Sequence, residues 1–352
     1  MSDERPSSAR RAPVALTLLK AFGARRSLKV VAEPEFGYAG YIEDARGRRS
    51  FFKGAAFDLN PFGAASIARD KAYAAHFLKA AGFRVPEALL ISAPAFIDEI
   101  RTKNPAVAER LNDAAAALAF AGRVGWPVYV KPNDESEGRG VLRASDAAAL
   151  TRALATLSRD HDRLLVQQAA AGRDYRILVL DDAVLAAFER RPFAVTGDGV
   201  STLSALIEAR TEGFAADGNG RKIRSDDPRI LDHLTASGLT PGHVPRAGET
   251  VDLLPNANLS SGGSAEEVTA AMSPHFGRIA VAAGRALGLR FYGLDLLCAD
   301  ITAEAGDYAI LELNAAPGLS HFHRMGPAEA ACVEAIYETL FERLVDTLQA
   351  AP

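Results

Sequence analysis

Residues 310–318 read ILELNAAPG, and this segment constrains the fold more than any other part of the chain. It begins with the apolar residues of a buried strand and ends abruptly at a Pro-Gly pair. Because side chains alternate along a strand, Glu312 and Asn314 share one face, and Leu311 and Leu313 point the other way. An unpaired buried carboxylate costs several kcal/mol, so this face must hold a cationic partner.

The preceding apolar segment, residues 291–300, carries Asp295 among leucines. A short polar link joins it to residues 307–318, which predicts an antiparallel pair of strands. If the strands pair, Asp295, Glu312 and Asn314 converge on one surface of a sheet. Three hard oxygen donors without His or Cys suit Mg²⁺. The alternative is that each acid pairs with an Arg or Lys across the sheet, and these residues alone leave both interpretations open.

The composition is that of an ordinary globular protein. The chain has 352 residues, of which 48% are hydrophobic and 24% charged, and this length predicts two or three structural units. Lys and Arg number 40 against 44 Asp and Glu, so the formal charge of −4 gives no electrostatic reason to expect nucleic acid or membrane as a partner. The first residues do not form a signal-peptide pattern, and no apolar run approaches the roughly 18 residues of a membrane span. A cytoplasmic location is therefore expected.

The pattern of apolar residues predicts alternating helices and strands. The first dozen residues are polar, and short apolar runs in residues 28–60 predict a small β-rich element. One helix is expected over residues 61–81, with Lys71 inside it, and a second over residues 105–121. Later expected elements are a helix after Ser145-Asp146, a hairpin around Asp181-Asp182, a helix over 274–287 between Ser273 and Gly288, and a helix over about 327–349 that docks through Ile336, Leu340 and Leu344.

Two further segments suggest a nucleotide. In residues 128–141, VYVKPNDESEGRGV, Lys131 ends a strand and precedes a Gly-containing loop, which can present an ammonium and backbone N–H groups to phosphate. A solvent-exposed turn is the alternative. In residues 164–176, LLVQQAAAGRDYR, a strand stops and resumes after Gly172, leaving groups free at a hinge where an adenine edge could be read. Alone, this second segment is only a strand, a turn and a strand.

Taken in order, these segments resemble the ATP-grasp superfamily, and most of all the ATP-grasp part of cyanophycin synthetase and of glutathione synthetase-type ligases. The resemblance covers about residues 60–325. The segments that carry it are IARDK (67–71), GRDYR (172–176), ERRPFAVTGDGVSTLSALIE (189–208), ANLSSGGSAEEVT (257–269) and LELNAAPG (311–318). The hinge departs from the pattern, because it has glutamine where relatives often have glutamate, so the adenine contact is expected to rest mainly on backbone groups.

The resemblance implies an α+β fold in which two α+β subdomains grip ATP between them. Residues 1–60 would form a tail and the β-rich element, residues 61–325 the ATP-grasp domain with a lid-like subdomain at about 125–170, and residues 326–352 a helix packed on the body. Specificity in such enzymes comes from loops and the N-terminal region, which is short here.

The resemblance also assigns site residues. The ATP phosphates would contact Lys71, Lys131, Arg190 and a flexible loop with Ser136, Gly138 and Gly140, whereas the adenine would lie at Gln167 and Gln168 and the ribose at Asp174. Asp295, Glu312 and Asn314 would hold two Mg²⁺ ions, with Mn²⁺ as an alternative. Independently of the resemblance, the Gly- and Asp-rich loop 211–227 offers the cations Arg221, Lys222 and Arg224 to close over substrate, or else it is a solvated surface loop.

The implied activity is carboxylate–amine ligation through an acylphosphate, with an amino acid or small peptide as substrate. The partners would be a small-molecule carboxylate and an amine, and a homodimer is left open. Two other functions fit the same residues. A small-molecule kinase would transfer the phosphoryl group to an alcohol, and a non-catalytic nucleotide-binding protein would keep the fold without turnover.

Overall fold

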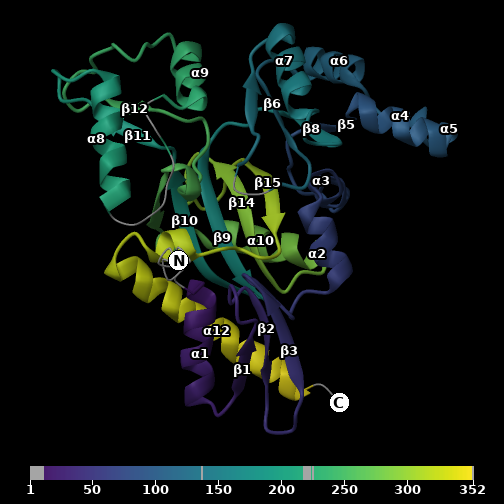
Figure 1. The fold of residues 1–352 in the computed structure, drawn as a ribbon, viewed down its shortest axis with the longest axis vertical. Helices are drawn as coiled ribbons and strands as arrows, with labels where there is room; N and C mark the ends of the chain where they lie inside the picture. Colours follow the sequence, from purple (N-terminus) through teal and green to yellow (C-terminus); the bar gives the residue numbers. More distant parts are fainter. Residues whose placement is uncertain (1–11, 136–137, 217–222, 224–225, 351–352) are drawn as a thin grey trace, which may run out of the picture.

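The structure is a computed structural model that describes residues 12–135, 138–216, 223 and 226–350. A five-stranded sheet lies at its centre (Figure 1). The N-terminal element lies below this sheet, and two units, one around β6 and the other around α8 and α9, lie above it. The central sheet therefore lies between the N-terminal element and these two units.

The N-terminal element contains helix α1 (Val14–Arg25) and a four-stranded antiparallel sheet of order β1-β2-β3-β4. The strands are β1 (Lys29–Ala32), β2 (Ala39–Glu43), β3 (Arg49–Lys53) and β4 (Ala56–Phe57), which confirms the expected β-rich element in residues 28–60. Helix α1 is an addition to that expectation, and its buried Leu16, Leu19 and Phe22 recur at the spacing of a helix face.

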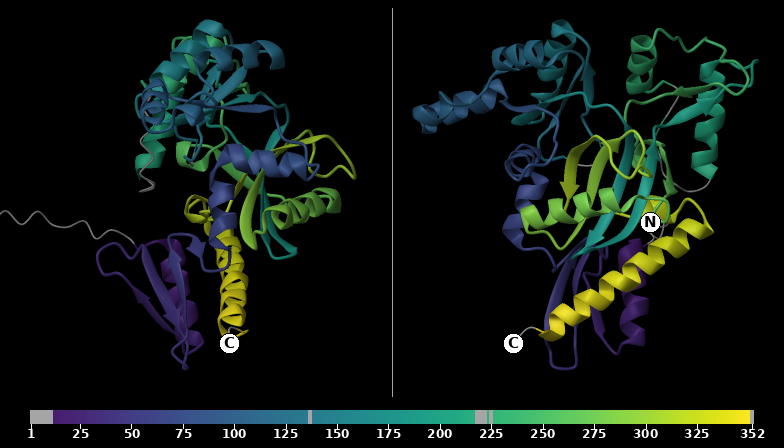
Figure 2. Two further views of the ribbon diagram at one scale, coloured as in Figure 1. Left: turned by 90° about the vertical axis from the view of Figure 1, so that its right-hand side faces the viewer. Right: turned by 180° about the vertical axis from the view of Figure 1, so that it is seen from behind.

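Helix α12 (Pro327–Ala350) anchors the N-terminal element to the rest of the protein. Its residues Ile336, Leu340 and Leu344 are buried, as the four-residue spacing predicts. The rings of Phe22 and Phe341 lie 5.5 Å apart between α1 and α12. Figure 2 shows α12 running along the N-terminal element.

The single helix expected over residues 61–81 is wrong, because two helices occupy this range: α2 (Phe62–Arg69) and α3 (Lys71–Ala80). The break occurs at Asp70, which has an extended backbone and accepts a hydrogen bond from the Tyr73 N–H. A short polar side chain that caps a new helix competes with continuation of the previous one. Lys71 therefore begins α3 rather than lying inside a helix.

The helix expected over residues 105–121 is divided for the same reason. The helices observed in this range are α5 (Pro105–Ala108) and α6 (Ala114–Val124), and a further helix, α4 (Pro94–Lys103), precedes them. Asn104 caps α5, and Asp113 caps α6 by accepting from the Ala116 N–H. Both caps are polar residues immediately before apolar runs, so the signal was present in the sequence.

Helices α6 and α7 (Ala147–Leu157) cover a four-stranded sheet of order β5-β8-β6-β7. Its strands are β5 (Ala88–Ser92), β6 (Val128–Pro132), β7 (Leu142–Ala144) and β8 (Arg163–Gln168). Val128, Val130 and Val166 face the helices and are fully buried. Because side chains alternate, Lys131 and Gln167 lie on the other face of this sheet.

The central sheet has the order β13-β10-β9-β14-β15, and all its neighbours are antiparallel. The strands are β9 (Arg173–Leu180), β10 (Ala183–Arg191), β13 (Ser264–Glu267), β14 (Phe291–Cys298) and β15 (Tyr308–Asn314). The predicted hairpin at Asp181 and the predicted antiparallel pair of β14 and β15 are both confirmed. Helix α10 (Pro274–Leu287) begins and ends as predicted, lies across this sheet when it is seen from behind (Figure 2), and packs on it.

The remaining elements lie close to the edges of the central sheet. Strands β11 (Ala194–Thr196) and β12 (Thr250–Asp252) pair with each other beside α8 (Leu203–Ala216) and α9 (Pro228–Ala236). Two short helices, η1 (Leu259–Ser261) and α11 (Ser320–His323), connect the longer elements. In the part of the chain that the structure describes, no helix is long and apolar enough to cross a membrane.

One face of the central sheet is apolar at one end of its strands and charged at the other. Leu178 and Leu180 of β9 belong to the apolar core formed with α1 and α12. Two residues before Leu178 on the same face lies Arg176, which is opposite Asp295 on β14. The N-terminal element therefore covers the apolar half of this face and borders its charged half.

Candidate active site

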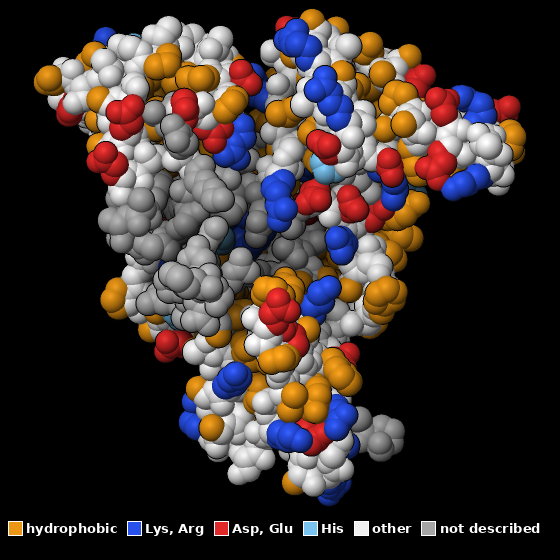
Figure 3. Space-filling view, viewed as in Figure 1, with side chains coloured by type: hydrophobic (Ala, Val, Ile, Leu, Met, Phe, Trp, Pro, Cys, Tyr) orange, Lys and Arg blue, Asp and Glu red, His pale blue; other side chains and the backbone are white. Residues whose placement is uncertain are grey.

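A cavity of about 990 Å³ adjoins the charged half of the central sheet. It is lined by β15, α2, residues Asp134 and Glu135, and the N-terminal element. Lys and Arg side chains (blue) lie above and to the right of the hollow in the middle of this face, with Asp and Glu side chains (red) among them, and hydrophobic side chains lie below it (Figure 3). Of the predicted site residues, Lys71, Arg190, Glu312 and Asn314 line the cavity.

Three charged residues form a row across the sheet. The strand register places Asp295 of β14 opposite Arg176 of β9 on one side and opposite Glu312 of β15 on the other. Residues directly opposite each other in an antiparallel pair present their side chains on the same face. The convergence predicted for the acids of β14 and β15 is therefore present in the register.

The Asp295 carboxylate is held by two arginines. The Nε and Nη2 atoms of Arg176 donate to its two oxygens at 2.7 Å each, and Nη2 of Arg190 lies 2.9 Å from Oδ2. Arg190 also lies 2.6 Å from Oδ1 of Asp174. The interpretation that acids pair with arginines across the sheet thus holds for Asp295. Two acids and two arginines give a group with no net charge.

This group keeps Asp295 ionised. Burial opposes its charged form, but Arg176 and Arg190 outweigh burial and lower the pKa of Asp295 well below its usual range. The side chain is 6% exposed. The carboxylate is thus ionised, as a metal ligand requires, but both of its oxygens accept from arginine, so a divalent cation would have to replace one of these contacts.

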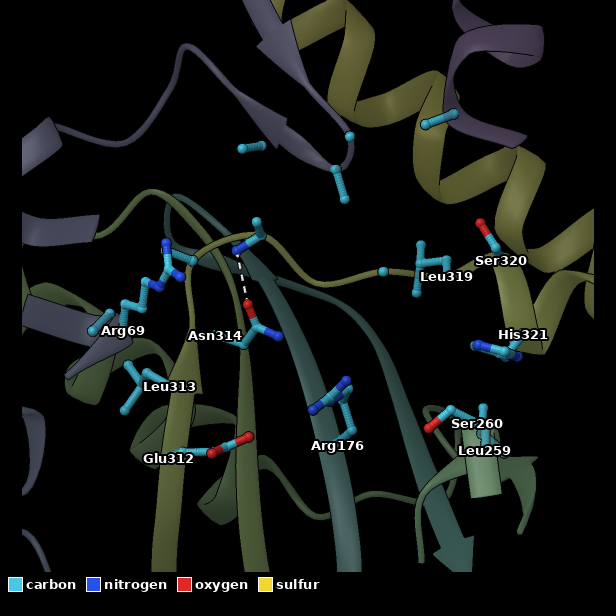
Figure 4. Close-up of a pocket in the computed structure, with 18 of the residues that line it drawn as sticks. Arg69, Arg176, Leu259, Ser260, Glu312, Leu313, Asn314, Leu319, Ser320 and His321 are labelled. Atoms are coloured by element: carbon cyan, nitrogen blue, oxygen red, sulfur yellow. Dashed lines mark hydrogen bonds between the residues drawn. The ribbon is translucent and has the colours of Figure 1, made fainter. Parts of the chain in front are cut away.

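Glu312 and Asn314 face the cavity directly (Figure 4). Nζ of Lys71 lies 3.7 Å from Oε2 of Glu312 and donates to the backbone carbonyl of Glu135. Oδ1 of Asn314 accepts from the Ala316 N–H at 3.0 Å, which shapes the turn after β15. The Lys71 contact fixes a cation beside the acid that the sequence interpretation assigned to a metal.

The donor set fits Mg²⁺. Asp295, Glu312 and Asn314 supply carboxylate and amide oxygens on one face of adjacent strands, and Mg²⁺ commonly takes few protein oxygens together with water and phosphate oxygens. Among the described residues, no three His, Cys, Asp or Glu side chains gather into a metal site. A site with two acids and one amide has too few His, Cys, Asp or Glu side chains to form such a cluster. Its remaining oxygen ligands would come from water and from a nucleotide.

Lys131 lies in a more enclosed position. Its Nζ donates to Oε1 of Gln167 at 2.8 Å, and both side chains are buried. Burial, together with the smaller effect of Lys71, lowers the pKa of Lys131 to about 8, although Glu312 opposes this change. The electrostatic influence of Lys71 and Glu312 shows that Lys131 lies close to the charged side of the cavity.

Several predicted nucleotide residues do not line the cavity. Gln168 donates to the Val124 carbonyl at 3.4 Å, at the end of α6, and Asp174 pairs with Arg190. These two residues, with Lys131, Gln167 and Asp295, are absent from the lining. Ser136, Arg221, Lys222 and Arg224 lie outside the described residues.

The loop after β6 approaches the central part of the protein at one point. Gly138 and Gly140 both have φ of +67°, which favours glycine. A Cβ atom on Gly138 would lie 1.9 Å from Nδ2 of Asn258. Glycine at position 138 is therefore required both by the backbone conformation and by the close approach of Asn258.

Sequence reasoning missed four cavity residues that now stand out: Tyr38, Lys53, Arg69 and Arg176. Arg176 could have been found, because it lies two positions after Asp174 and shares its face of a strand. Arg69 belongs to a quoted segment, IARDK, but was given no role. Tyr38 and Lys53 reach the cavity through the tertiary packing of the N-terminal element, which has no local signal.

Comparison with known proteins identifies the fold. Residues 68–201 match the model of the RimK-like ATP-grasp domain. The structure is similar to the crystal structure of a bifunctional glutathione synthetase from Pasteurella multocida, with a TM-score of 0.56 and 19% sequence identity. The alignment includes 93% of this chain and 44% of that chain. The fold is an ATP-grasp fold. The α+β fold class predicted from the sequence is thereby confirmed.

Curated relatives agree with the ATP-grasp assignment. The chain is 32% identical over 261 residues to cyanophycin synthetase of Trichormus variabilis, covering 72% of this chain and 26% of that protein. It is 31% identical over 268 residues to the glutathione biosynthesis bifunctional protein GshAB of Enterococcus faecalis, covering 73% of this chain and 33% of that protein. The chain thus spans about a quarter to a third of the length of these relatives.

Proposed function

We propose that this protein is an ATP-dependent ligase that joins a carboxylate to an amine through an acylphosphate, with an amino acid or small peptide as substrate. The observation that carries the proposal is the meeting of Glu312 and Asn314 with the cations Lys71 and Arg190 around one cavity. The similarity to cyanophycin synthetase and to a glutathione biosynthesis protein supports the same reaction class. We place the reaction in the cytoplasm, where ATP is available.

The reaction has two steps. An oxygen of the substrate carboxylate attacks the γ-phosphorus of ATP, the bond from that phosphorus to the bridging oxygen breaks, and ADP leaves. The amine nitrogen then attacks the acyl carbon, phosphate leaves with the electrons of the C–O bond, and the nitrogen loses a proton to give the amide. Both reactants of the first step are anions, so reducing their repulsion is the main task of the protein.

The cations of the cavity are suited to this task. Lys71 provides an ammonium beside the sheet from a largely buried position, and Arg190 provides a guanidinium that also pairs with Asp174 and Asp295. Asp295, Glu312 and Asn314 would hold Mg²⁺, which supplies Lewis-acid neutralisation of the phosphoryl oxygens when it is bound. Two Mg²⁺ ions, with Mn²⁺ as a substitute, are the stoichiometry that we propose.

The nucleotide would extend from the cavity toward the sheet of order β5-β8-β6-β7. In this arrangement Gln167 and Gln168 lie at the adenine, Asp174 at the ribose, and Lys131 with Gly138 and Gly140 at the phosphates. The pKa of Lys131, about 8, leaves a fraction of this lysine uncharged at neutral pH. An adjacent phosphate would favour the ammonium form, so binding of ATP would complete the charge of the site.

ADP release from pairs of amino acids and short peptides, followed by mass measurement of the product, tests the proposal. We expect ADP release to require both a carboxylate and an amine, and the product mass to equal the sum of the two substrates less one water. A stable phosphorylated alcohol formed without an amine would instead identify a kinase. ATP binding without turnover on any pair would leave the protein as a nucleotide-binding protein.

A further inference from the structure

The wall of the cavity that faces the central sheet comes from the N-terminal element and α2. The N-terminal element contributes Tyr38 and the β3–β4 hairpin with Lys53 and Gly54, and α2 contributes Phe62 and Arg69. None of these five residues belongs to the proposed nucleotide or metal site. The wall therefore adjoins the reaction site without being part of it.

Two cations on this wall lack partners, whereas the cations on the sheet side have them. Lys71 pairs with Glu312, and both Arg176 and Arg190 pair with Asp295. In contrast, the side chains of Lys53 and Arg69 make no hydrogen bond or ion pair with any residue that the structure describes. In Figure 4, Arg69 and Arg176 lie on either side of Asn314. The wall thus presents positive charge that no side chain among the described residues pairs with.

The hairpin that carries Lys53 is locally well defined. The Gly54 N–H donates to the Tyr38 carbonyl at 2.7 Å, and φ of Gly54 is +60°. The Tyr38 ring lies over this turn, because a Cβ atom on Gly54 would lie 2.7 Å from the Tyr38 hydroxyl. Lys53 is consequently held at a fixed point of the wall by its own backbone.

Exposed aromatic side chains lie beside the two cations. Tyr38 is 52% exposed and Phe62 is 88% exposed, although both border the cavity. Exposed aromatic groups on the wall of a cavity provide contact area for the apolar or peptide portion of a ligand. Cations next to aromatic rings are therefore suited to a ligand that carries both a carboxylate and a carbon skeleton.

We propose that this wall is a subsite for a second carboxylate of the substrate, with Lys53 and Arg69 as specificity-determining residues. The substrate class is then an acidic amino acid or a short acidic peptide. One carboxylate reaches the ATP phosphates near Lys71, and the other binds at the wall. The inference rests on the proposed ligase function, because that function defines the carboxylate that reacts.

The chemistry of the two side chains explains the preference. The planar guanidinium of Arg69 can bind a carboxylate through two parallel hydrogen bonds, and the ammonium of Lys53 adds a point charge. An amide of the same shape keeps the hydrogen-bond acceptor but loses the charge. The difference in affinity between an acid and its amide therefore measures the subsite directly.

Calorimetric titration of matched ligands tests the subsite. The probes are L-glutamate against L-glutamine, L-aspartate against L-asparagine, and Ala-Glu against Ala-Gln, each with saturating Mg²⁺ and a non-hydrolysable ATP analogue. We expect at least one acid to bind about tenfold or more tightly than its amide, as charge-assisted hydrogen bonds predict. Lys53→Gln and Arg69→Gln should each reduce this ratio to near one, and Lys53→Arg should retain it.

Lys20→Gln is the matched control, because Lys20 is an exposed lysine of the same N-terminal element that does not line the cavity. It should leave the acid-to-amide ratio unchanged, and a thermal melt should show that all variants fold. Equal affinity for every acid and its amide in the wild-type protein overturns the subsite. So does a ratio that survives both Lys53→Gln and Arg69→Gln.

Turnover separates this inference from the proposed function. If acids bind with dependence on Lys53 but no amine yields ADP, the ligase proposal fails and the subsite stands. If amide bonds form equally well from acids and their amides, the ligase proposal stands and the subsite fails.

Discussion

Asp295 and Arg176 lie opposite each other on β14 and β9 and are joined by two hydrogen bonds of 2.7 Å. The pair is largely buried, with 6% of the Asp295 side chain and 18% of the Arg176 side chain exposed. Removing one partner of such a pair leaves a buried charge less compensated. The arrangement therefore links the stability of the central sheet to the charge state of the candidate active site.

Arg176→Ala should destabilise the protein by about 3 kcal/mol, the lower end of the range for a broken buried pair, because Arg190 still contacts Asp295. Urea unfolding at pH 7 measures this change. Arg285→Ala is the control, since Arg285 pairs with Asp182 on the surface with both side chains more than 60% exposed. Its effect should be below about 1 kcal/mol. Equal midpoints for the two variants would contradict the role given to Arg176.

The same pair predicts a dependence of stability on pH. Because the pKa of Asp295 is lowered in the folded state, its contribution is fully present above the unfolded value of about 4 and is lost as the pH falls below it. The unfolding free energy of the wild-type protein should therefore decrease more steeply than that of Asp295→Asn below about pH 4. Parallel pH profiles would show that the Asp295 carboxylate is not stabilised by its arginines.

Glu312→Gln should lower kcat for ADP release by about 100-fold or more, because the substitution removes a charged oxygen ligand and weakens the contact with Lys71. Mg²⁺ titrations of activity should shift to higher concentration in the same variant. Glu304→Gln serves as the control, because Glu304 is an exposed residue on the link between β14 and β15. Wild-type turnover by Glu312→Gln would refute the metal assignment.

The lowered pKa of Lys131 predicts that nucleotide binding depends on pH. Its pKa of about 8 means that the ammonium form is lost above this pH in the free protein, so the affinity for an ATP analogue should fall as the pH rises from 7 to 9.5. The affinity of Lys131→Gln should be weaker and nearly constant over that range. Fluorescence titration with a labelled analogue provides the measurement. A wild-type profile that stays flat would remove Lys131 from the phosphate site.

Gly138→Ala should raise KM for ATP about tenfold or more, because a Cβ atom would clash with Asn258 and φ is +67°. Adding Asn258→Ala should restore part of the loss by relieving the clash, while the backbone strain stays. Gly242→Ala is the control, since the nearest atom to its Cβ is 4.0 Å away and its φ is not positive. An unchanged KM in Gly138→Ala would mean that the loop does not form this contact during turnover.

The sequence predicted the parts of the fold that have local signals. Ser273 and Gly288 bracket α10 because a cap and a left-handed glycine act within one turn of the helix. The break at Asp70 was missed, although its Asp was visible, because the apolar residues of α2 and α3 together mimic one long helix. The register that brings Asp295 opposite Glu312 followed from pairing two strands that are neighbours in sequence.

The parts that sequence reasoning missed depend on distant packing. Arg176 meets Asp295 only because β9 pairs with β14, which lies more than a hundred residues away. Lys53 reaches the cavity because the N-terminal element docks on α12. Neither relationship has a periodicity or a cap that could indicate it. Arg176 belongs to the segment GRDYR, in which only Asp174 was given a role, and Lys53 lies outside every segment of the resemblance.

The contact of α1 with α12 has a consequence for the order of assembly. Phe22 and Phe341 meet across this contact, yet more than three hundred residues separate them in the chain. On a ribosome, α1 would emerge long before α12, so this contact can form only when synthesis has reached the residues of α12. The wall that we assign to substrate selection would then take its final position late, after the strands that precede it in the chain have been made.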